Sequence, residues 1–406
     1  MLPIESPWSI RLPEWPSFNA EHSHVESDSE QHEFNQIKGQ YDEEALRSHS
    51  INTRCYLDSK FLQIERDQVF QRSWQFVCHE EKLREPNSYI AIDVQGQSVV
   101  AIRNKAGELK AFYNVCKHRG HELIFGEGKT KKLTCPYHAW TYNLDGALVV
   151  APRSEHIENF NAGEICLEPV QIEVFCHFVF VNLDPDAAPL AEQTGELANE
   201  VMSFAPDLAR LTFATRLTYN IKANWKSVVD NFLECYHCPV AHKGFSSMID
   251  MDTYKVKTHG IYSSHMAKAR TGANSAYNIE GASVNDHAVW FLWPNITLMR
   301  YPGRGNFMAW RFYPVNETET YEVFDFFFET AEPNDTEKEA LAFIDDVLQV
   351  EDINLVESVQ RGMSTPAFNS GRYMVDVDGS GMSEHAVHHF HGLMLDAYQR
   401  ASEQAN

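Results

Sequence analysis

Two short clusters of cysteine and histidine constrain the fold of this 406-residue chain more than any other feature of its sequence. Cys116 and His118 form the first pair, and after 16 intervening residues Cys135 and His138 form the second pair. Each pair follows a β-rich run, so we expect each in a tight loop from which both side chains reach one metal centre. Two thiolates and two imidazoles can bind either one structural zinc ion or a two-iron, two-sulfur cluster.

The way the two residue types are divided between the loops favours the iron–sulfur cluster. Zinc fingers usually pair Cys with Cys and His with His, whereas here each loop supplies one of each. Two loops of this kind can grip a flat [2Fe–2S] diamond from both sides, with Cys on one iron and His on the other. Because two His ligands raise the potential of such a cluster, we predict a centre that relays electrons.

A second candidate centre lies around His237 and His242, in a segment whose pattern predicts a helix over residues 225–236. Side chains five residues apart are about 140° apart around an ideal helix, so both can reach one ion only if the helix is distorted. Pro239, between them, supplies a reason for that distortion. Cys235 and Cys238 surround His237 and could instead form a redox pair.

Two His and one carboxylate on one face of an iron ion form the ligand triad of non-haem Fe(II) oxygenases. The missing carboxylate is expected on a long predicted helix, residues 336–359. Asp352 is our choice, although Asp345, Asp346 and Glu357 share that helix.

The remaining pattern predicts two domains of the α+β class. Antiparallel β-structure is expected first, over residues 89–94, 98–103, 109–115, 147–150 and 174–182. Helices and strands mix after residue 185, with helices over 190–204, 225–236 and 336–359 and strands over 287–293, 295–301, 306–315 and 321–329. This pattern indicates a small antiparallel β domain followed by a larger domain whose antiparallel sheet is flanked by helices.

We place the domain boundaries by composition and periodicity. Residues 1–50 are acidic and lack apolar periodicity, which predicts an arm that drapes over a neighbouring subunit or stays mobile. Residues 51–185 are assigned to the β domain, with a lead-in amphipathic helix over 61–74. Residues 186–406 are assigned to the domain with the second metal centre.

The two Cys/His loops with their flanks resemble the Rieske family. Three further stretches, residues 224–242, 351–362 and 379–394, resemble the oxygenase (α) components of Rieske non-haem iron oxygenases. The resemblance extends from about residue 50 to residue 398 and is greatest to carnitine monooxygenase and related betaine oxygenases. It implies a Rieske [2Fe–2S] cluster on Cys116, His118, Cys135 and His138, and a mononuclear iron on His237, His242 and Asp352.

One position is typical of this subgroup. Most Rieske oxygenases have an Asp three residues before the first iron-binding His, and this chain has Glu234, as carnitine monooxygenases do. The resemblance implies that Glu234 bridges the two metal centres across a subunit boundary. A homotrimer is therefore expected.

The resemblance also implies a reaction. The enzyme would use dioxygen to hydroxylate a carbon next to a quaternary nitrogen, after which the C–N bond breaks. No Gly-x-Gly-x-x-Gly fingerprint is present, so we expect the electrons from a separate flavin and iron–sulfur reductase that oxidises NAD(P)H. A quaternary cation favours aromatic faces, for which the candidates are Phe232, Trp290, Phe291 and Trp293. The alternative within the family is an aromatic-ring-hydroxylating dioxygenase.

The amino-acid composition limits the classes of binding partner that this chain can have. There are 34 Lys and Arg against 57 Asp and Glu, and the net charge of −23 disfavours binding to nucleic acid or to anionic membranes. The sequence shows no secretory leader and no long apolar segment, so we expect a cytoplasmic protein. Two non-enzymatic alternatives, an electron-transfer ferredoxin and a zinc-stabilised binding protein, are disfavoured by the second centre and by the mixed Cys/His loops respectively.

Overall fold

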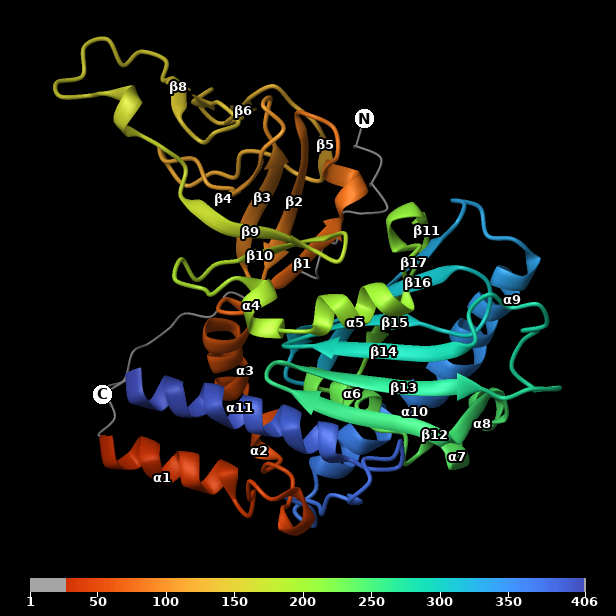
Figure 1. Ribbon diagram of the computed structural model, residues 1–406. Helices are drawn as coiled ribbons and strands as arrows, with labels where there is room; N and C mark the ends of the chain where they lie inside the picture. The colour runs from red at the N-terminus through yellow and green to blue at the C-terminus, as the bar shows by residue number, and fades with distance from the viewer. Residues whose placement is uncertain (1–26, 405–406) are drawn as a thin grey trace. The chain divides into compact units, whose positions relative to one another are not determined.

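The structure, a computed structural model, describes residues 27–404 and divides into two compact units, each with its own antiparallel sheet (Figure 1). The first unit contains residues 70–192, and the second contains the described residues of 17–69 together with those from 193 onward. Helices are concentrated in the second unit, so the predicted α+β class is confirmed.

The first unit is built from two antiparallel sheets. The seven-stranded sheet has the order β1-β10-β9-β4-β3-β2-β5, and a three-stranded sheet has the order β6-β7-β8. The strands are β1 (Gln75–His79), β2 (Ser88–Val94), β3 (Gln97–Arg103), β4 (Leu109–Tyr113), β5 (Glu127–Lys129), β6 (Leu133–Thr134), β7 (Thr141–Tyr142), β8 (Leu148–Val150), β9 (Pro169–Phe175) and β10 (Phe178–Asn182). Short 3₁₀ turns are η3 (Glu80–Leu83) and η4 (Ala162–Glu164).

The predicted strands over 89–94, 98–103 and 109–115 are present as β2, β3 and β4, each paired with its neighbour. The predicted strand over 174–182 is instead a hairpin, because β9 and β10 are joined by a turn at Cys176 and His177. Both turn residues have positive φ, 47° and 65°. This two-residue turn reverses the chain without Gly or Asn, the usual residues for such a conformation.

The second unit is organised around a seven-stranded antiparallel sheet of order β11-β17-β16-β15-β14-β13-β12. Its strands are β11 (Thr212–Ile221), β12 (Ile249–His259), β13 (Tyr262–Ala269), β14 (Asp286–Leu292), β15 (Ile296–Arg300), β16 (Asn306–Asn316) and β17 (Glu319–Phe328). The last four correspond to the predicted strands, whereas β11, β12 and β13 were not predicted.

Helices cover this sheet and carry the second candidate centre. They are α1 (Ser27–Lys38), η1 (Ala45–Arg47), α2 (Arg54–Leu57), α3 (Ser59–Glu65), the π-helical η2 (Arg66–Phe70), α5 (Leu197–Phe204), η5 (Leu208–Arg210), α6 (Trp225–Phe232), α7 (Cys238–Ala241), α8 (Lys243–Met248), α9 (Asp335–Phe343), the π-helical η6 (Ile344–Leu348), α10 (Gln349–Met363) and α11 (His385–Gln404). A short helix, α4 (Leu190–Thr194), spans the boundary between the units. Helix α6 packs against β16, β17 and α10, while α11 runs along β12 and α3.

The predicted long helix over 336–359 is confirmed as the continuous succession α9, η6 and α10. The predicted helix over 190–204 is interrupted, because Gly195 adopts a φ of 54° between α4 and α5. No helix within residues 27–404 is long and apolar enough to cross a bilayer.

The N-terminal segment differs from the predicted arm. From α1 onward it packs on its own chain, where Tyr41 stacks on His388 of α11 with ring centroids 4.7 Å apart. The carbonyl oxygen of Asp42 lies 2.8 Å from Nε2 of the same His388. Residues 1–26 of the predicted arm lie outside the described residues. Residues 51–69, assigned by sequence to the β domain, belong to the second unit.

A buried ion pair explains why the lead-in helix belongs to the second unit. The Glu65 carboxylate at the end of α3 accepts hydrogen bonds from Lys226 Nζ (2.6 Å), Trp225 Nε1 (2.6 Å) and Tyr398 OH (2.5 Å). Glu65 and Lys226 are fully buried, and this group of hydrogen-bonded side chains joins the three helices α3, α6 and α11. Asn224 caps the N-terminus of α6 by accepting a bond from the backbone N–H of Lys226 at 3.0 Å.

Replacing one member of this pair should destabilise the second unit strongly. Lys226→Met leaves the Glu65 carboxylate buried without its cation, which typically costs about 3–5 kcal/mol. Urea unfolding of the purified protein measures the effect. Lys338→Met, at an exposed ion pair with Asp335, is the matched control and should change the unfolding free energy little. The double variant Lys226→Met/Glu65→Gln should recover part of the loss, and an unchanged midpoint for Lys226→Met would refute this role of the pair.

Candidate metal centres

The two Cys/His loops of the first unit have matching geometry. Cys116 and His118 follow β4, and Cys135 and His138 lie between β6 and β7. In each loop the N–H four residues after the Cys donates to that Cys carbonyl, at 2.9 Å from Gly120 and 3.0 Å from Ala139. Both donors have positive φ, 73° and 59°. The same tight turn thus presents one thiol and one imidazole from each loop.

The burial of these side chains suits a cluster with one inner and one outer iron. Cys116 and Cys135 are 1% and 2% exposed, and neither forms a disulfide. His118 is exposed and His138 half-buried, with ring centroids 4.6 Å apart. The buried thiols and outer imidazoles therefore fit a [2Fe–2S] cluster whose His-bound iron lies toward the surface, where electrons can enter and leave.

Neighbouring aromatic groups hold these ligands in place. The Tyr142 hydroxyl lies 3.5 Å from Cys116 Sγ and accepts the backbone N–H of Lys117 at 3.0 Å. Trp140 stacks on His118 with ring centroids 4.9 Å apart. These contacts restrict the rotamers of the donor side chains.

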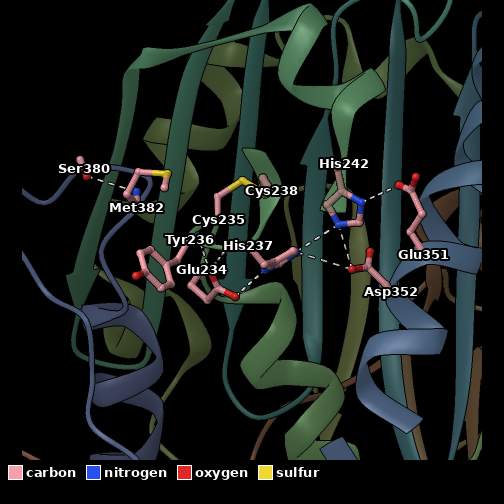
Figure 2. Close-up of a disulfide and its surroundings, with 10 residues drawn as sticks. All are labelled: Glu234, Cys235, Tyr236, His237, Cys238, His242, Glu351, Asp352, Ser380 and Met382. Atoms are coloured by element: carbon pink, nitrogen blue, oxygen red, sulfur yellow. Dashed lines mark hydrogen bonds and ion pairs between the residues drawn. A yellow bond between two sulfur atoms is a disulfide. The ribbon is translucent and has the colours of Figure 1, made fainter. Parts of the chain in front are cut away.

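The second centre depends on an interruption in a helix. The sequence predicted one helix over 225–236, but α6 ends at Phe232 and α7 begins at Cys238. The irregular segment between them is anchored where Cys235 N–H donates to Gly381 O at 3.0 Å, and a Cys235–Cys238 disulfide closes it (Figure 2). Because His237 lies at the end of this irregular segment, the separation of about 140° that an intact helix would impose on His237 and His242 does not apply.

Three side chains converge on one point. His237 Nε2 and His242 Nε2 are 3.1 Å apart, and Asp352 Oδ1 lies 2.9 Å from the second and 3.6 Å from the first (Figure 2). Ligands at adjacent corners of an octahedral ion with bonds of about 2.1 Å are separated by about 3 Å. The two imidazoles and the carboxylate thus fit three neighbouring positions around one ion, as a facial triad requires.

Carboxylates fix which ring nitrogen faces that point. Glu234 accepts at His237 Nδ1, and Glu351 lies with its Oε2 2.8 Å from His242 Nδ1. Each interaction leaves Nε2 as the ligand atom. Glu351 was not among the residues predicted from the sequence, although it directly precedes Asp352.

The other acidic candidates on the late helix have different partners. Asp345 accepts a bond from Tyr219 OH at 2.7 Å, and Glu357 accepts one from the backbone N–H of Lys222 at 3.1 Å. Asp346, in η6, does not belong to the converging set. Of the four acids on this helix considered from sequence, Asp352 alone joins the two histidines within the described residues.

The charges within the set reinforce one another. Burial by itself would lower the pKa of His237, but hydrogen bonds with the Asp352 and Glu234 carboxylates raise it to about 9. Burial would raise the pKa of Asp352, yet its hydrogen bonds with the two histidines hold it below its usual value. An ionised carboxylate is therefore present among the donors, as a metal ligand must be.

The four aromatic candidates separate into two groups. Phe232, at the end of α6, contacts Trp310 edge-to-face with ring centroids 4.6 Å apart. In contrast, Trp290 is fully buried against Phe204. Phe291 and Trp293 are also buried and pack against Phe390 of α11.

Comparison with known proteins places the chain in a family. Residues 73–161 match the model of the Rieske [2Fe-2S] domain, and residues 208–400 match that of the ring hydroxylating alpha subunit (catalytic domain). The oxygenase subunit of carnitine monooxygenase from Escherichia coli K12 is 39% identical over 86% of this chain and 94% of that protein. The chloroplastic choline monooxygenase of Amaranthus tricolor is 32% identical over 83% of this chain and 75% of that protein.

A solved structure of a quaternary ammonium Rieske monooxygenase is also similar, with a TM-score of 0.81 and 32% identity over 90% of this chain and 98% of that one. The chain is a Rieske-type non-haem iron oxygenase with a [2Fe–2S] domain and a mononuclear iron domain. More particularly, it belongs to the monooxygenase family that includes the carnitine monooxygenase oxygenase subunits. This excludes the ferredoxin and zinc-protein alternatives.

Glu351 gives a test of how the second centre is supported. Glu351→Ala removes the hydrogen bond that orients His242, and loss of such support typically lowers metal affinity about 10–100-fold. Fe(II) titration of chelator-treated protein measures this, and the visible spectrum of the cluster should stay unchanged. Glu357→Ala, six residues further along α10, is the control and should bind iron normally. Equal affinities in the two variants would contradict this role of Glu351.

Proposed function

We propose that this protein is the oxygenase component of a two-component monooxygenase that hydroxylates the carbon next to the quaternary nitrogen of carnitine or a related betaine. The observation that carries the proposal is the convergence of His237, His242 and Asp352 in a chain 39% identical to a carnitine monooxygenase oxygenase subunit. The choline monooxygenase relatives support the same feature of the substrate, a quaternary nitrogen.

The donor sets described above carry the two metal centres in this proposal. Cys116, His118, Cys135 and His138 hold the [2Fe–2S] cluster, and His237, His242 and Asp352 hold the mononuclear iron. When bound, that iron supplies the reduction and activation of dioxygen at the positions the three protein ligands leave open. Glu234 and Glu351 hold the two imidazoles with Nε2 toward the iron.

The overall reaction needs two electrons from outside the chain. One oxygen atom of dioxygen enters the C–H bond and the other leaves as water, so NAD(P)H and one proton are consumed for each turnover. A separate flavin and iron–sulfur reductase supplies these electrons. The hydroxylated carbon next to nitrogen then loses the amine: carnitine would give trimethylamine and malic semialdehyde, and glycine betaine would give dimethylglycine and formaldehyde.

An aromatic pair beside the ligand segment suits the cationic end of such a substrate. Phe232 and Trp310 are each partly exposed, and their rings are in edge-to-face contact. A trimethylammonium group cannot donate a hydrogen bond, and aromatic faces are the usual way to bind it. Phe232 therefore remains a proposed substrate-binding residue, Trp310 joins it, and Trp290, Phe291 and Trp293 serve as core residues.

A substrate panel tests the proposed reaction without knowledge of the reductase. The cluster is reduced chemically, oxygen is added, and single-turnover products are analysed for L-carnitine, glycine betaine, choline and naphthalene. Release of trimethylamine or formaldehyde with one of the quaternary compounds is expected. Oxidation of naphthalene, with no turnover of any quaternary compound, would instead favour the ring-hydroxylating dioxygenase.

Glu234 is proposed to bridge the mononuclear iron to the cluster of a neighbouring subunit in a homotrimer. It lines a cleft of about 370 Å³ on the second unit, together with His237, Asp230 and His391. One of its oxygens meets His237 Nδ1 and the other accepts the backbone N–H groups of Tyr236 and His237. The oxygen that meets His237 Nδ1, Oε1, has a second lone pair, which an imidazole N–H from another subunit can use.

Glu234→Gln should slow electron transfer more than it reduces metal content. Gln keeps one acceptor oxygen but offers an NH2 group to the second donor, so half of the link is lost. Single-turnover reoxidation of the reduced cluster, in the presence of substrate and oxygen, measures the rate. Glu234→Asp should be impaired equally or less, depending on whether its shorter side chain spans the gap.

The matched control for this variant is Glu384→Gln, which removes a carboxyl from the same cleft without touching His237. It should reoxidise as the wild type does. Reoxidation at the wild-type rate in Glu234→Gln, with normal product yield, would remove the bridging role.

A further inference from the structure

Three acidic side chains are fully buried among the described residues, and one of them has no cationic partner. Glu65 is paired with Lys226, and Asp325 on β17 is paired with Arg216 and Arg311. Glu322, three residues earlier on β17, accepts hydrogen bonds from two neutral donors, Trp310 Nε1 at 2.6 Å and Gln349 Nε2.

The electrostatic environment of Glu322 is unfavourable to its charge. Burial raises the pKa of Glu322 well above its usual value, and the negative charge of Asp352 raises it further. The hydrogen bonds from Trp310 and Gln349 act in the opposite direction. A buried carboxyl without a cation is costly, and a cation supplied by a ligand would relieve that cost.

The two donors connect Glu322 to both sides of the mononuclear centre. Gln349 lies on α10, one helical turn before the ligand Asp352. Trp310 contacts Phe232, at the end of the helix that leads into the His237 segment. Glu322 therefore accepts the indole N–H of Trp310, while the ring of Trp310 is partly exposed and contacts Phe232.

The contact between Glu322 and Trp310 favours a positively charged ligand group over a neutral one. Cation–π attraction depends on negative charge at the ring face, and a carboxylate bonded to the indole N–H increases that charge. A cationic group beside this buried carboxyl favours its ionised form, and the ionised form attracts that group with little screening by solvent. A neutral ligand of the same shape gains neither contribution.

We propose that Glu322 is the counter-charge of the substrate's quaternary nitrogen and acts through Trp310 as the residue that selects a quaternary ammonium group over an uncharged group of equal size. This inference rests on the proposed function, because it deepens the description of the same substrate site. Glu322 is a positioning and selectivity residue in this scheme and does not touch the reacting carbon.

Binding measurements on the metal-loaded protein, without reductant, test the proposal. Two probes are titrated by calorimetry: L-carnitine, and its carbon isostere, which has carbon in place of the quaternary nitrogen and so keeps the carboxylate but lacks the positive charge. In Glu322→Gln the Kd for L-carnitine should rise about tenfold or more, as expected for loss of a buried charge several ångströms away. The Kd for the carbon isostere should stay the same or fall, so the preference for the quaternary nitrogen collapses.

A matched double variant separates charge from packing. Glu322→Gln/Gln349→Glu keeps one carboxyl and one amide in the same contact but moves the carboxyl across it. It should recover part of the preference for L-carnitine, and it provides the test if Glu322→Gln alone does not fold. A merely structural role for Glu322 predicts equal weakening of both probes in the single variant and no recovery in the double variant.

The outcomes distinguish this inference from the function on which it rests. Wild-type preference for L-carnitine that survives intact in Glu322→Gln overturns the role of Glu322 alone. Wild-type protein that binds L-carnitine no better than the carbon isostere, and oxidises no quaternary compound, overturns the proposed function and this inference together.

Discussion

The buried Glu65–Lys226 ion pair fixes the helix on which the mononuclear centre depends. Helix α6 runs from Trp225 to Phe232, and the Glu65 contacts hold its N-terminal turn against α3 and α11. Glu234 and His237 follow directly after its C-terminal end. Removal of charge from water is costly unless the pair is well bonded, and here the Glu65 carboxylate accepts three donors. The position of the metal ligands is thereby tied to the core of the second unit.

The irregular segment after α6 allows the two histidines to converge on one metal site. An intact helix would separate His237 and His242 by about 140°, whereas the structure brings their Nε2 atoms to 3.1 Å. The irregular segment does this with its own support, through the Cys235 N–H bond to Gly381 and the disulfide to Cys238. The third donor, Asp352, comes from α10, which packs directly against α6. The segment that follows α6 and the adjacent helix α10 thus hold all three donors.

The sequence allowed both donor sets and most of the strands to be predicted, because these features depend on local spacing. The cage candidates Trp290, Phe291 and Trp293 are buried in the structure, and composition alone does not distinguish a buried core ring from one beside a site. Trp310 and Gln349 were missed because their shared partner, Glu322, is apparent only after the sheet and α10 are packed. Strand β12, rich in Asp and Lys, lies at the sheet edge and lacks a strong apolar pattern.

Charge balance links these elements to the kind of ligand the second centre accommodates. Asp352 is a direct donor in the proposed site, and Glu234 and Glu351 contact the two imidazoles, so three carboxylates surround the position of the iron. A divalent ion with neutral imidazoles leaves one net negative charge in this group. The uncompensated carboxyl of Glu322 lies behind Trp310 on the adjoining strand. Such a site is better matched to a ligand with a quaternary ammonium group than to a neutral arene, because a neutral ligand would exclude water from these acids without compensating them.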